Sequence, residues 1–364
     1  MTDCLIVGGG LLGMLTARYL HDAGADVLVL DQSVPGHEAS WAGGGILSPL
    51  YPWRYPDPVT ALATYGQQHY AALAEALAAE SGGVDPEWTQ SGLLMLDEAG
   101  EAETALAWAK RHGLALERVA PSAVAEIEPA LADGRHEGLW MPAVAQIRNP
   151  RLVKALRGSL ASRGIDCREQ TPVERLLIEQ GRVRGVATPV GEIRAERVLV
   201  ASGAWSAGLL AGAGLAIAVE PVRGQMILFG ARPGVLGRIV LADDRYLIPR
   251  RDGHILCGST LEHVGFDKGT TQAAMEELHA AAIERVPALA DYPVVKHWAG
   301  LRPGSPQGIP YIGAHPEVEG LYVNAGHYRN GVVLGLASAW LAADLLLGRS
   351  PVLDPQPYAP ASPH

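Results

Sequence analysis

Three glycines near the N-terminus have the spacing of a phosphate-binding turn: Gly8, Gly10 and Gly13. They follow the apolar run 4–7 and open a segment, residues 11–23, whose apolar residues recur at helical spacing. Glycines at these positions allow a tight turn, close approach of the backbone to a pyrophosphate, and close packing of a helix on a strand. The free N–H groups of Leu11 and Leu12 at the start of the helix would then point at the phosphates.

A carboxylate follows at the place where such a unit binds ribose. The apolar run 27–30 predicts a buried strand that ends at Asp31 and completes a βαβ unit of about 30 residues. Asp31 could accept hydrogen bonds from ribose hydroxyls, and its charge would repel a 2′-phosphate. A glycine-rich turn with no ligand is the alternative, but the strand, the helix and the acid together favour a dinucleotide, either FAD or NAD.

Two further segments favour FAD. Residues 39–48 are rich in small side chains, and Gly44, Gly45 and Ile46 would let backbone N–H groups approach the edge of a flavin ring. A flexible loop is the alternative for this segment. Residues 325–331 follow a strand-like run and lead into an apolar helix whose positive end could face the ring's pyrimidine edge, where reduced flavin carries negative charge.

Composition and charge exclude several classes of function. With 48 % hydrophobic and 19 % charged residues among 364, the chain has the composition of a folded globule of about two or three domains. The formal charge of −10 would repel a phosphate backbone, so we expect no nucleic-acid partner.

Cysteine and histidine usage predicts neither a metal site nor a disulfide framework. The three cysteines are far apart, and the 12 histidines form no zinc-like cluster. We therefore expect a reducing, cytoplasmic location. Asp3 stands where a secretory signal would carry basic residues, and the apolar stretch 331–343 is shorter than the roughly 20 residues that span a bilayer, so we predict a buried helix and no membrane span.

The remaining patterns predict two sheets. Helical spacing recurs over 59–79 and 102–112, and residues 174–201 look like strands that turn at Gly181, Gly185 and Gly191. Residues 219–259 are mainly strand-like, with a hairpin turn at 250–253, and predict a separate sheet. Two smaller expectations are an i, i+4 pair between Arg18 and Asp22 and a loose, proline-rich tail over 351–364.

Together these motifs resemble the D-amino-acid oxidase family of FAD enzymes, and most closely its bacterial glycine oxidases, over residues 4–347. The most specific motifs are YLIPR (246–250), WAGLRP (298–303), PYIG (310–313) and GHYRNG (326–331). The resemblance implies a Rossmann-like α/β domain that binds FAD noncovalently and is assembled from residues 1–80, 145–218 and 299–350. It also implies an antiparallel-sheet substrate domain formed by residues 81–144 and 219–298.

The resemblance also assigns residues to the two ligands. Besides the three glycines, the residues implied in FAD binding are Leu11, Leu12, Asp31, Gln32, Ala39, Ser40, Gly44, Gly45, Ile46, Val173, His327, Tyr328, Arg329, Asn330, Gly331, Val332 and Val333. Those implied at the substrate are Tyr246, Arg302 and Arg329.

Elementary chemistry gives these substrate residues roles. A planar guanidinium such as that of Arg302 can bind an amino-acid carboxylate bidentately, and Tyr246 can add a hydrogen bond. The amine lone pair can then assist departure of the Cα hydrogen to the flavin, forming an imine, so no strong side-chain base is needed. Structural alternatives stand beside these roles: Arg302 bonding backbone carbonyls at a turn, Tyr246 filling the core, Arg329 reinforcing its loop, and His327 being a satisfied structural histidine, which we prefer.

The activity implied is oxidative deamination of glycine and other small amines or D-amino acids, such as sarcosine and D-alanine. Oxygen would accept the electrons to give hydrogen peroxide, and water would release a keto acid, glyoxylate from glycine, with ammonia. In relatives the imine feeds thiamine thiazole synthesis. Trp41, Ser48 and Leu261 depart from or tune the family pocket and affect substrate preference.

Two other functions remain open at this point. One is an FAD-dependent D-amino-acid dehydrogenase that passes electrons to a quinone or protein; the other is a noncatalytic flavin-binding module. The sequence leaves the oligomeric state open, a homo-oligomer included.

Overall fold

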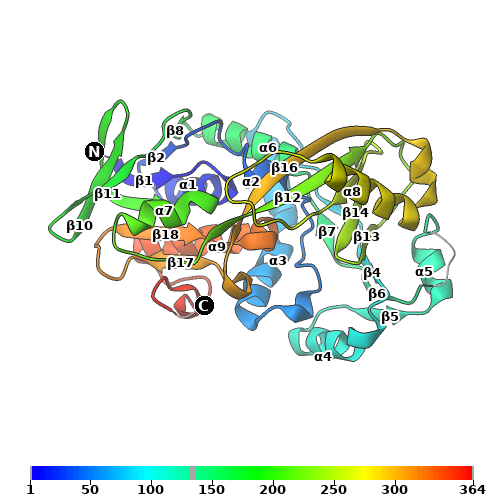
Figure 1. Cartoon of the computed structure of the whole chain (residues 1–364). Helices are drawn as coiled ribbons and strands as arrows, with labels where there is room; N and C mark the ends of the chain where they lie inside the picture. The colour runs from blue at the N-terminus through cyan, green and yellow to red at the C-terminus, as the bar shows by residue number, and fades with distance from the viewer. Residues whose placement is uncertain (1, 132–135, 363–364) are drawn as a thin grey trace.

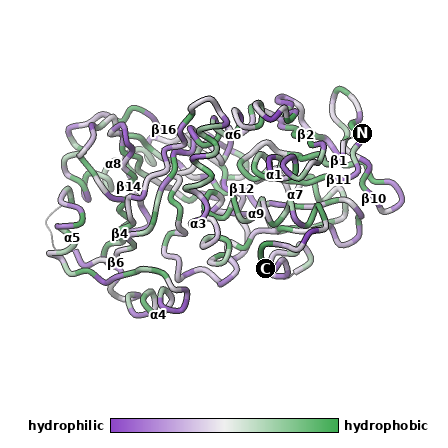
Figure 2. Tube along the Cα trace, turned by 180° about the vertical axis from the view of Figure 1, so that it is seen from behind, coloured by the Kyte–Doolittle hydropathy of each residue, from purple (hydrophilic) through white to green (hydrophobic). Residues whose placement is uncertain are grey.

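The structure is a computed structural model that describes residues 2–131 and 136–362. It contains two eight-stranded sheets that lie in two neighbouring parts of the molecule (Figure 1). Both chain ends belong to the part that holds the first sheet, as the view from behind also shows (Figure 2). This arrangement confirms the predicted α/β fold with a second, separate sheet.

The first sheet is built around the predicted βαβ unit. Its central strands run in parallel in the order β18 (Leu321–Ala325), β11 (Gly191–Val200), β1 (Thr2–Val7), β2 (Val27–Leu30) and β8 (Asp166–Arg168). β17 (Tyr311–Ala314) adds an antiparallel edge, and β10 (Arg182–Thr188) and β9 (Arg175–Glu179) extend β11 as an antiparallel ribbon.

Both faces of this sheet are buried, which explains why its strands are continuous apolar runs. On one face Ile6 and Val29 pack under four helices: α1 (Leu11–Asp22), α3 (Asp57–Glu80), α6 (Asn149–Ser162) and α9 (Gly331–Leu347). On the other face Leu5 and Leu28 pack under β9, β10 and α7 (Ser206–Ala211).

The apolar C-terminal helix α9 is a core element. It packs against α1 and α3, and its mean hydropathy is high because it is buried nearly all round. Counted with the preceding turn, the stretch Tyr328–Leu347 has 20 residues, so by length and composition it could cross a membrane, unlike the shorter apolar stretch 331–343. However, 72 % of its most apolar window is buried inside the protein. The predicted buried helix is confirmed.

The second sheet follows the order β16 (Val294–Gly304), β12 (Glu220–Phe229), β15 (Ile255–Gly258), β14 (Arg245–Pro249), β13 (Ile239–Ala242), β4 (Leu93–Leu96), β6 (Gly138–Met141) and β5 (Glu117–Val119). Its neighbours are antiparallel except for β13 and β4, which run in parallel. One face carries α8 (Gln272–Arg285), and the other carries α4 (Ala102–His112). Smaller elements are α2 (Ala39–Ala42), α5 (Pro121–Ile127) and the ribbon β3 (Thr89–Gln90) with β7 (Ala145–Gln146).

The segments expected for the two domains supply the two sheets, except that β16 belongs to the second sheet while its residues fall in segments expected for both domains. β16 runs across the expected boundary at residues 298/299 and pairs along its length with β12. Because this continuous strand crosses the expected boundary, the division into two domains remains a prediction of the sequence.

Three local expectations differ from the structure. Gly185 lies within β10 at a register shift rather than at a turn. Arg18 contacts Glu80 through two hydrogen bonds of 2.6 and 3.1 Å instead of pairing with Asp22, because α1 packs beside the end of α3. The expected loose tail is anchored at Tyr358, whose side chain is 2 % exposed and whose hydroxyl donates to the Pro58 carbonyl at 2.8 Å.

Candidate active site

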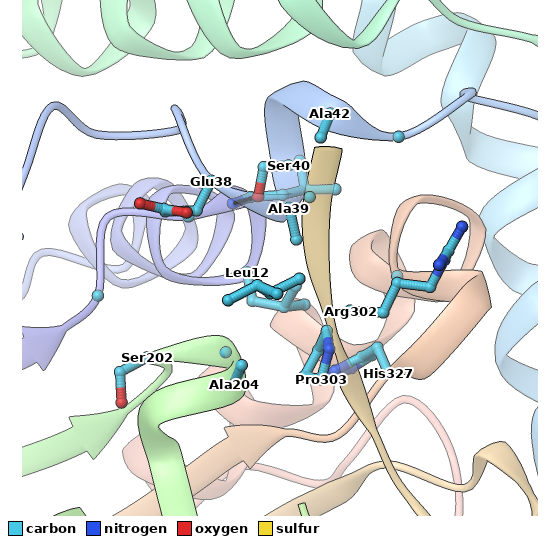
Figure 3. A pocket seen from close by; sticks show the side chains of 18 of the residues that line it. Leu12, Glu38, Ala39, Ser40, Ala42, Ser202, Ala204, Arg302, Pro303 and His327 are labelled. Atoms are coloured by element: carbon cyan, nitrogen blue, oxygen red, sulfur yellow. Dashed lines mark hydrogen bonds between the residues drawn. The ribbon is translucent and has the colours of Figure 1, made fainter. Parts of the chain in front are cut away.

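A cavity of about 470 Å³ lies where the two sheets meet. Its walls come from the ends of β1 and β2, the starts of α1 and α9, the segment around α2, and strands β12, β14 and β16. Figure 3 shows Ala39, Ser40 and Ala42 on one side of this cavity, with Ala204, Pro303 and His327 opposite and Leu12 between them. Residues far apart in the sequence therefore face one common space.

The glycine motif adopts the predicted strand–turn–helix geometry. Gly8 has φ +109°, and a Cβ added to it would stand 2.4 Å from the Ala201 carbonyl oxygen. A Cβ on Gly13 would stand 1.9 Å from the Gly8 carbonyl oxygen, so this glycine lets α1 pack onto the turn. The Leu11 N–H at the start of α1 donates to the Ser40 hydroxyl at 2.8 Å, which places Ser40 at the helix end that the sequence assigns to the pyrophosphate.

Asp31 is fixed at the end of β2. One carboxylate oxygen accepts the Gly9 N–H at 2.8 Å, and the other accepts the Ser33 N–H at 2.8 Å. The carboxylate is thus held between the glycine turn and the following loop, at the cavity wall. Its remaining lone pairs are available to ribose hydroxyls.

The glycine-rich segment is ordered by pairing with the chain before α6. The Leu47 N–H donates to the Ala145 carbonyl at 2.9 Å, and the Ile147 N–H donates to the Gly45 carbonyl at 2.8 Å. Gly45 has φ +79°, and a Cβ there would stand 2.0 Å from the Ile147 carbonyl oxygen. The segment is a built wall of the cavity and not a free loop.

Two buried polar atoms near the start of α9 lack hydrogen-bond partners among the described residues. Within the described residues, His327 Nε2 and Asn330 Nδ2 are buried and have no hydrogen-bond partner. Both residues line the cavity, and α9 begins there without a side-chain cap. Burial lowers the pKa of His327 to about 3, so its ring is neutral. The expectation of a satisfied structural histidine therefore does not match the structure, because this ring nitrogen lacks a partner.

Arg302 presents a partly buried guanidinium to the cavity, and its hydrogen-bond partners among the described residues are neutral. Its Nη2 donates to the Ser259 hydroxyl at 2.6 Å, and its Nη1 donates to the Thr260 carbonyl at 3.3 Å. Burial lowers the pKa of Arg302, an effect that the nearby Tyr246 opposes and Arg329 reinforces. No carboxylate forms an ion pair with Arg302 in the part of the chain that the structure describes. The side chain therefore combines the expected carbonyl contact with an unneutralised charge.

Tyr246 and Arg329 flank this charge. Tyr246 is 7 % exposed, belongs to the second sheet's core and also lines the cavity. Its hydroxyl lies 3.4 Å from the Met226 sulfur, a weak acceptor that leaves it free to bind a ligand oxygen. Arg329 lines the cavity, and its side chain makes no ion pair or hydrogen bond within the described residues.

The structure brings nearly all of the predicted site residues to this one cavity. Two do not line it: Gly13, which packs α1 on the turn, and Val333, which is buried against α3. Sequence reasoning left out other lining residues, among them Glu38, Leu50, Thr171, Ser202, Ala204, Trp205, Gly224, Met226 and Ser259. The small residues after β11 carried a usable signal, since they follow a strand as the first motif does; Met226 and Ser259 carried none.

These observations fit a dinucleotide with a ring system. Two helix ends, a carboxylate on β2 and two unpartnered polar side chains meet in one cavity. Fold and site together define a flavin-dependent oxidoreductase of the dinucleotide-binding type.

Comparison with known proteins agrees. The model of the family described as FAD dependent oxidoreductase matches residues 3–345, and the chain belongs to this family. It is 52 % identical over 358 residues to a glycine oxidase of Pseudomonas aeruginosa, covering 98 % of both chains. A bifunctional protein ThiO/ThiG of Nostoc is 31 % identical over 95 % of this chain and 52 % of its own length.

A solved structure has the same fold as this chain. The crystal structure of glycine oxidase from Geobacillus kaustophilus superposes with a TM-score of 0.95 at 30 % identity, covering 100 % of this chain and 99 % of that one. The predicted resemblance and FAD as the cofactor are thereby confirmed.

Proposed function

We propose that this enzyme oxidatively deaminates glycine and similarly small amines, such as sarcosine and D-alanine. The observation that carries the proposal is the Arg302 guanidinium, which is partly buried in the cavity wall and has only neutral hydrogen-bond partners among the described residues. A buried cation without a counter-ion favours an anionic ligand, and a planar guanidinium fits a carboxylate. The glycine oxidase names of similar proteins supply the substrate class.

Arg302 and Tyr246 would hold the substrate carboxylate. The guanidinium keeps N–H donors free beyond its contacts to Ser259 and Thr260, since arginine has five. Tyr246 stands beside it and can donate its hydroxyl proton to the same carboxylate. With the carboxylate fixed by two side chains, the amine and Cα are directed into the remaining cavity, which lowers the entropic cost of reaching the reactive arrangement.

FAD, which the glycine turn, Asp31 and the wall at Gly45 would hold in the cavity, would supply the acceptor for two electrons and the Cα hydrogen. The protein residues supply position and a fixed electrostatic field. Burial keeps His327 neutral, and none of the residues that the structure describes places a carboxylate beside Arg302, so the site favours a neutral amine whose lone pair assists the oxidation. Water then hydrolyses the imine, so that glycine, water and oxygen give glyoxylate, ammonia and hydrogen peroxide.

The wall near Tyr246 is suited to a small side chain. Ile46, Ser48, Leu50 and Met226 line this part of the cavity. Leu261, which the sequence places at the pocket, is 45 % exposed and does not line it, because its neighbours Ser259 and Thr260 are the residues that contact Arg302. We therefore assign the limit on substrate size to the four lining residues.

We further propose that FAD is bound noncovalently and that the enzyme acts in the cytoplasm. Cys4, Cys167 and Cys257 are free thiols, and none of them lines the cavity. Burial raises the pKa of the Cys167 thiol to about 11, which keeps it unreactive. The ThiO/ThiG relative supports a role in supplying the imine for thiazole synthesis.

Anaerobic mixing with amino acids tests the substrate proposal. Glycine should bleach the flavin absorbance, and admitting oxygen should restore it with formation of hydrogen peroxide. Bleaching without reoxidation by oxygen would instead identify a dehydrogenase with a quinone or protein acceptor. No bleaching by glycine, sarcosine or any D-amino acid, with FAD fully bound, would overturn the proposal.

A further inference from the structure

Arg250 is a second buried arginine that the substrate chemistry leaves unexplained. It follows β14 directly and is only 8 % exposed. Burial is the main cause that lowers its pKa, to about 10, so the side chain is still charged at neutral pH. No carboxylate forms an ion pair with it within the described ranges 2–131 and 136–362. A buried charge without a counter-ion is costly, so a compensating role is expected.

The guanidinium of Arg250 binds three neutral acceptors, one in the cavity wall and two in the segment that pairs with this wall. Its Nη2 donates to the Gly44 carbonyl at 2.6 Å. Its Nη1 donates to the Gln146 side-chain oxygen at 2.8 Å and to the Ile147 carbonyl at 3.3 Å. Gly44 belongs to the glycine-rich wall, and residues 146 and 147 belong to the segment that pairs with that wall. Arg250 therefore joins both segments to the second sheet.

Alternate residues of β14 and its extension form one platform under Gly44. A Cβ added to Gly44 would stand 2.9 Å from Ile248 Cδ1 and 3.2 Å from a ring carbon of Tyr246. Residues 246, 248 and 250 share one face because side chains alternate along a strand. The same face thus carries the substrate-binding Tyr246 and the clamp on the Gly44 carbonyl.

Clamping this carbonyl fixes the direction of the next N–H group. The Gly44–Gly45 peptide is planar and trans, so its C=O and N–H point in opposite directions. Since the carbonyl points to Arg250, the Gly45 N–H points away from it, and this N–H has no acceptor among the described residues. Gly45 lines the cavity. A glycine on each side of the bond would otherwise leave this peptide free to rotate.

We propose that Arg250 is a positioning residue for FAD. Its side chain fixes the Gly44–Gly45 peptide so that the Gly45 N–H faces the bound flavin, and its unpaired charge favours the reduced cofactor. The inference rests on FAD binding by the family and not on the identity of the substrate. It predicts two separable effects: the three-acceptor clamp sets affinity for FAD, and the positive charge raises the midpoint potential.

Two substitutions separate the clamp from the charge. Arg250→Met removes both, and we expect it to weaken FAD binding to the reconstituted protein by about tenfold or more and to lower the midpoint potential. Each tenfold change in the ratio of affinities for oxidised and reduced FAD corresponds to about 30 mV. Arg250→Lys keeps the charge but cannot hold three acceptors in a planar fork, so we expect the potential to recover while FAD affinity stays weakened.

Arg251→Met is the matched control on the same turn. Arg251 contacts Asp85, Thr89 and Trp88 at the surface and does not line the cavity. The FAD affinity, flavin spectrum and potential of this variant should therefore equal those of the unmodified protein. Circular dichroism of each FAD-free protein reports folding independently.

The proposal is overturned if folded Arg250→Met binds FAD with unchanged affinity, spectrum and potential. If only Arg250→Lys folds, unchanged FAD affinity in that variant has the same meaning. If neither folds without FAD, Arg250 acts in fold stability and the proposal is overturned as well. None of these measurements uses substrate, so failure of the proposed activity gives a different pattern. The Arg250 variants would then still change FAD affinity and midpoint potential as expected, while the unmodified protein would oxidise no amino acid.

Discussion

Replacing Arg302 with alanine is the most direct test of the substrate site. The side chain holds no carboxylate among the described residues, and its contacts to Ser259 and Thr260 are to neutral oxygens. Its removal therefore does not strand a buried acid, unlike the loss of one partner of a buried ion pair. We expect Arg302→Ala to fold and to retain FAD.

The magnitude follows from the lost contact. A bidentate, charge-assisted pair in a buried site contributes about 3 kcal/mol to transition-state binding. At about 1.4 kcal/mol for each factor of ten, kcat/KM for glycine should fall by about 150-fold. Arg302→Lys should recover part of this loss, since an ammonium supplies the charge without the planar fork.

Steady-state oxygen consumption and anaerobic flavin reduction measure the effect. Ser259→Ala, which removes the 2.6 Å acceptor that orients Arg302, should cost about tenfold because a hydrogen bond to a charged group contributes about 1.5 kcal/mol. Arg251→Ala on the surface serves as the control. Near-normal kcat/KM in Arg302→Ala with full flavin content would assign Arg302 to structure and refute the reasoning.

Four further predictions concern the cofactor, the pocket and the fold. Acid precipitation should release all FAD into the supernatant, and flavin that stays with the pellet would contradict noncovalent binding. Glycine, sarcosine and D-alanine should reduce the flavin faster than D-phenylalanine, and L-alanine should not reduce it. Stopped-flow absorbance at saturating substrate measures these rates, and faster reduction by D-phenylalanine than by glycine would reject the small pocket. Gly45→Ala should lose FAD affinity by about tenfold or more, because its Cβ would stand 2.0 Å from the Ile147 carbonyl oxygen, and fluorescence titration with FAD reports it. Burial raises the pKa of Glu80, but hydrogen bonds from Arg18 and Arg163 outweigh this and hold it at about 2. The Glu80 carboxylate therefore stabilises the fold above its unfolded pKa and loses that effect as the pH falls from about 4.5 to 2. Glu80→Gln should lower the free energy of unfolding, measured with urea, by about 2 kcal/mol at pH 7 and by progressively less toward pH 2.

Part of the fold and site was predictable because it is encoded by near neighbours in the sequence. The turn at Gly8, the helix after it and the acid at Asp31 form one unit whose spacing is set by local geometry. The apolar helix α9 begins and ends where its composition changes, at Gly331 and Leu347. Such features need little information from the rest of the chain.

Resemblance to a family extended the prediction to residues far apart in the chain. It placed Tyr246, Arg302 and Arg329 together, and the structure brings all three to one cavity. Composition and periodicity alone would not have placed these three residues together, because each residue lies in a strand or turn whose pattern is equally typical of the core.

Only the tertiary structure decided which partner each side chain meets. Arg18 binds Glu80 rather than Asp22, since α1 lies beside the end of α3 and a carboxylate across that contact is better placed than one on the helix surface. The clamp from Arg250 to Gly44 joins residues that are 206 positions apart, and no local pattern announces it. The sequence by itself determined which elements form and which cofactor they suit. The packing of the two sheets determined the wall of the site, because hydrogen bonds between distant segments depend on where whole elements lie and not on the spacing of residues within them.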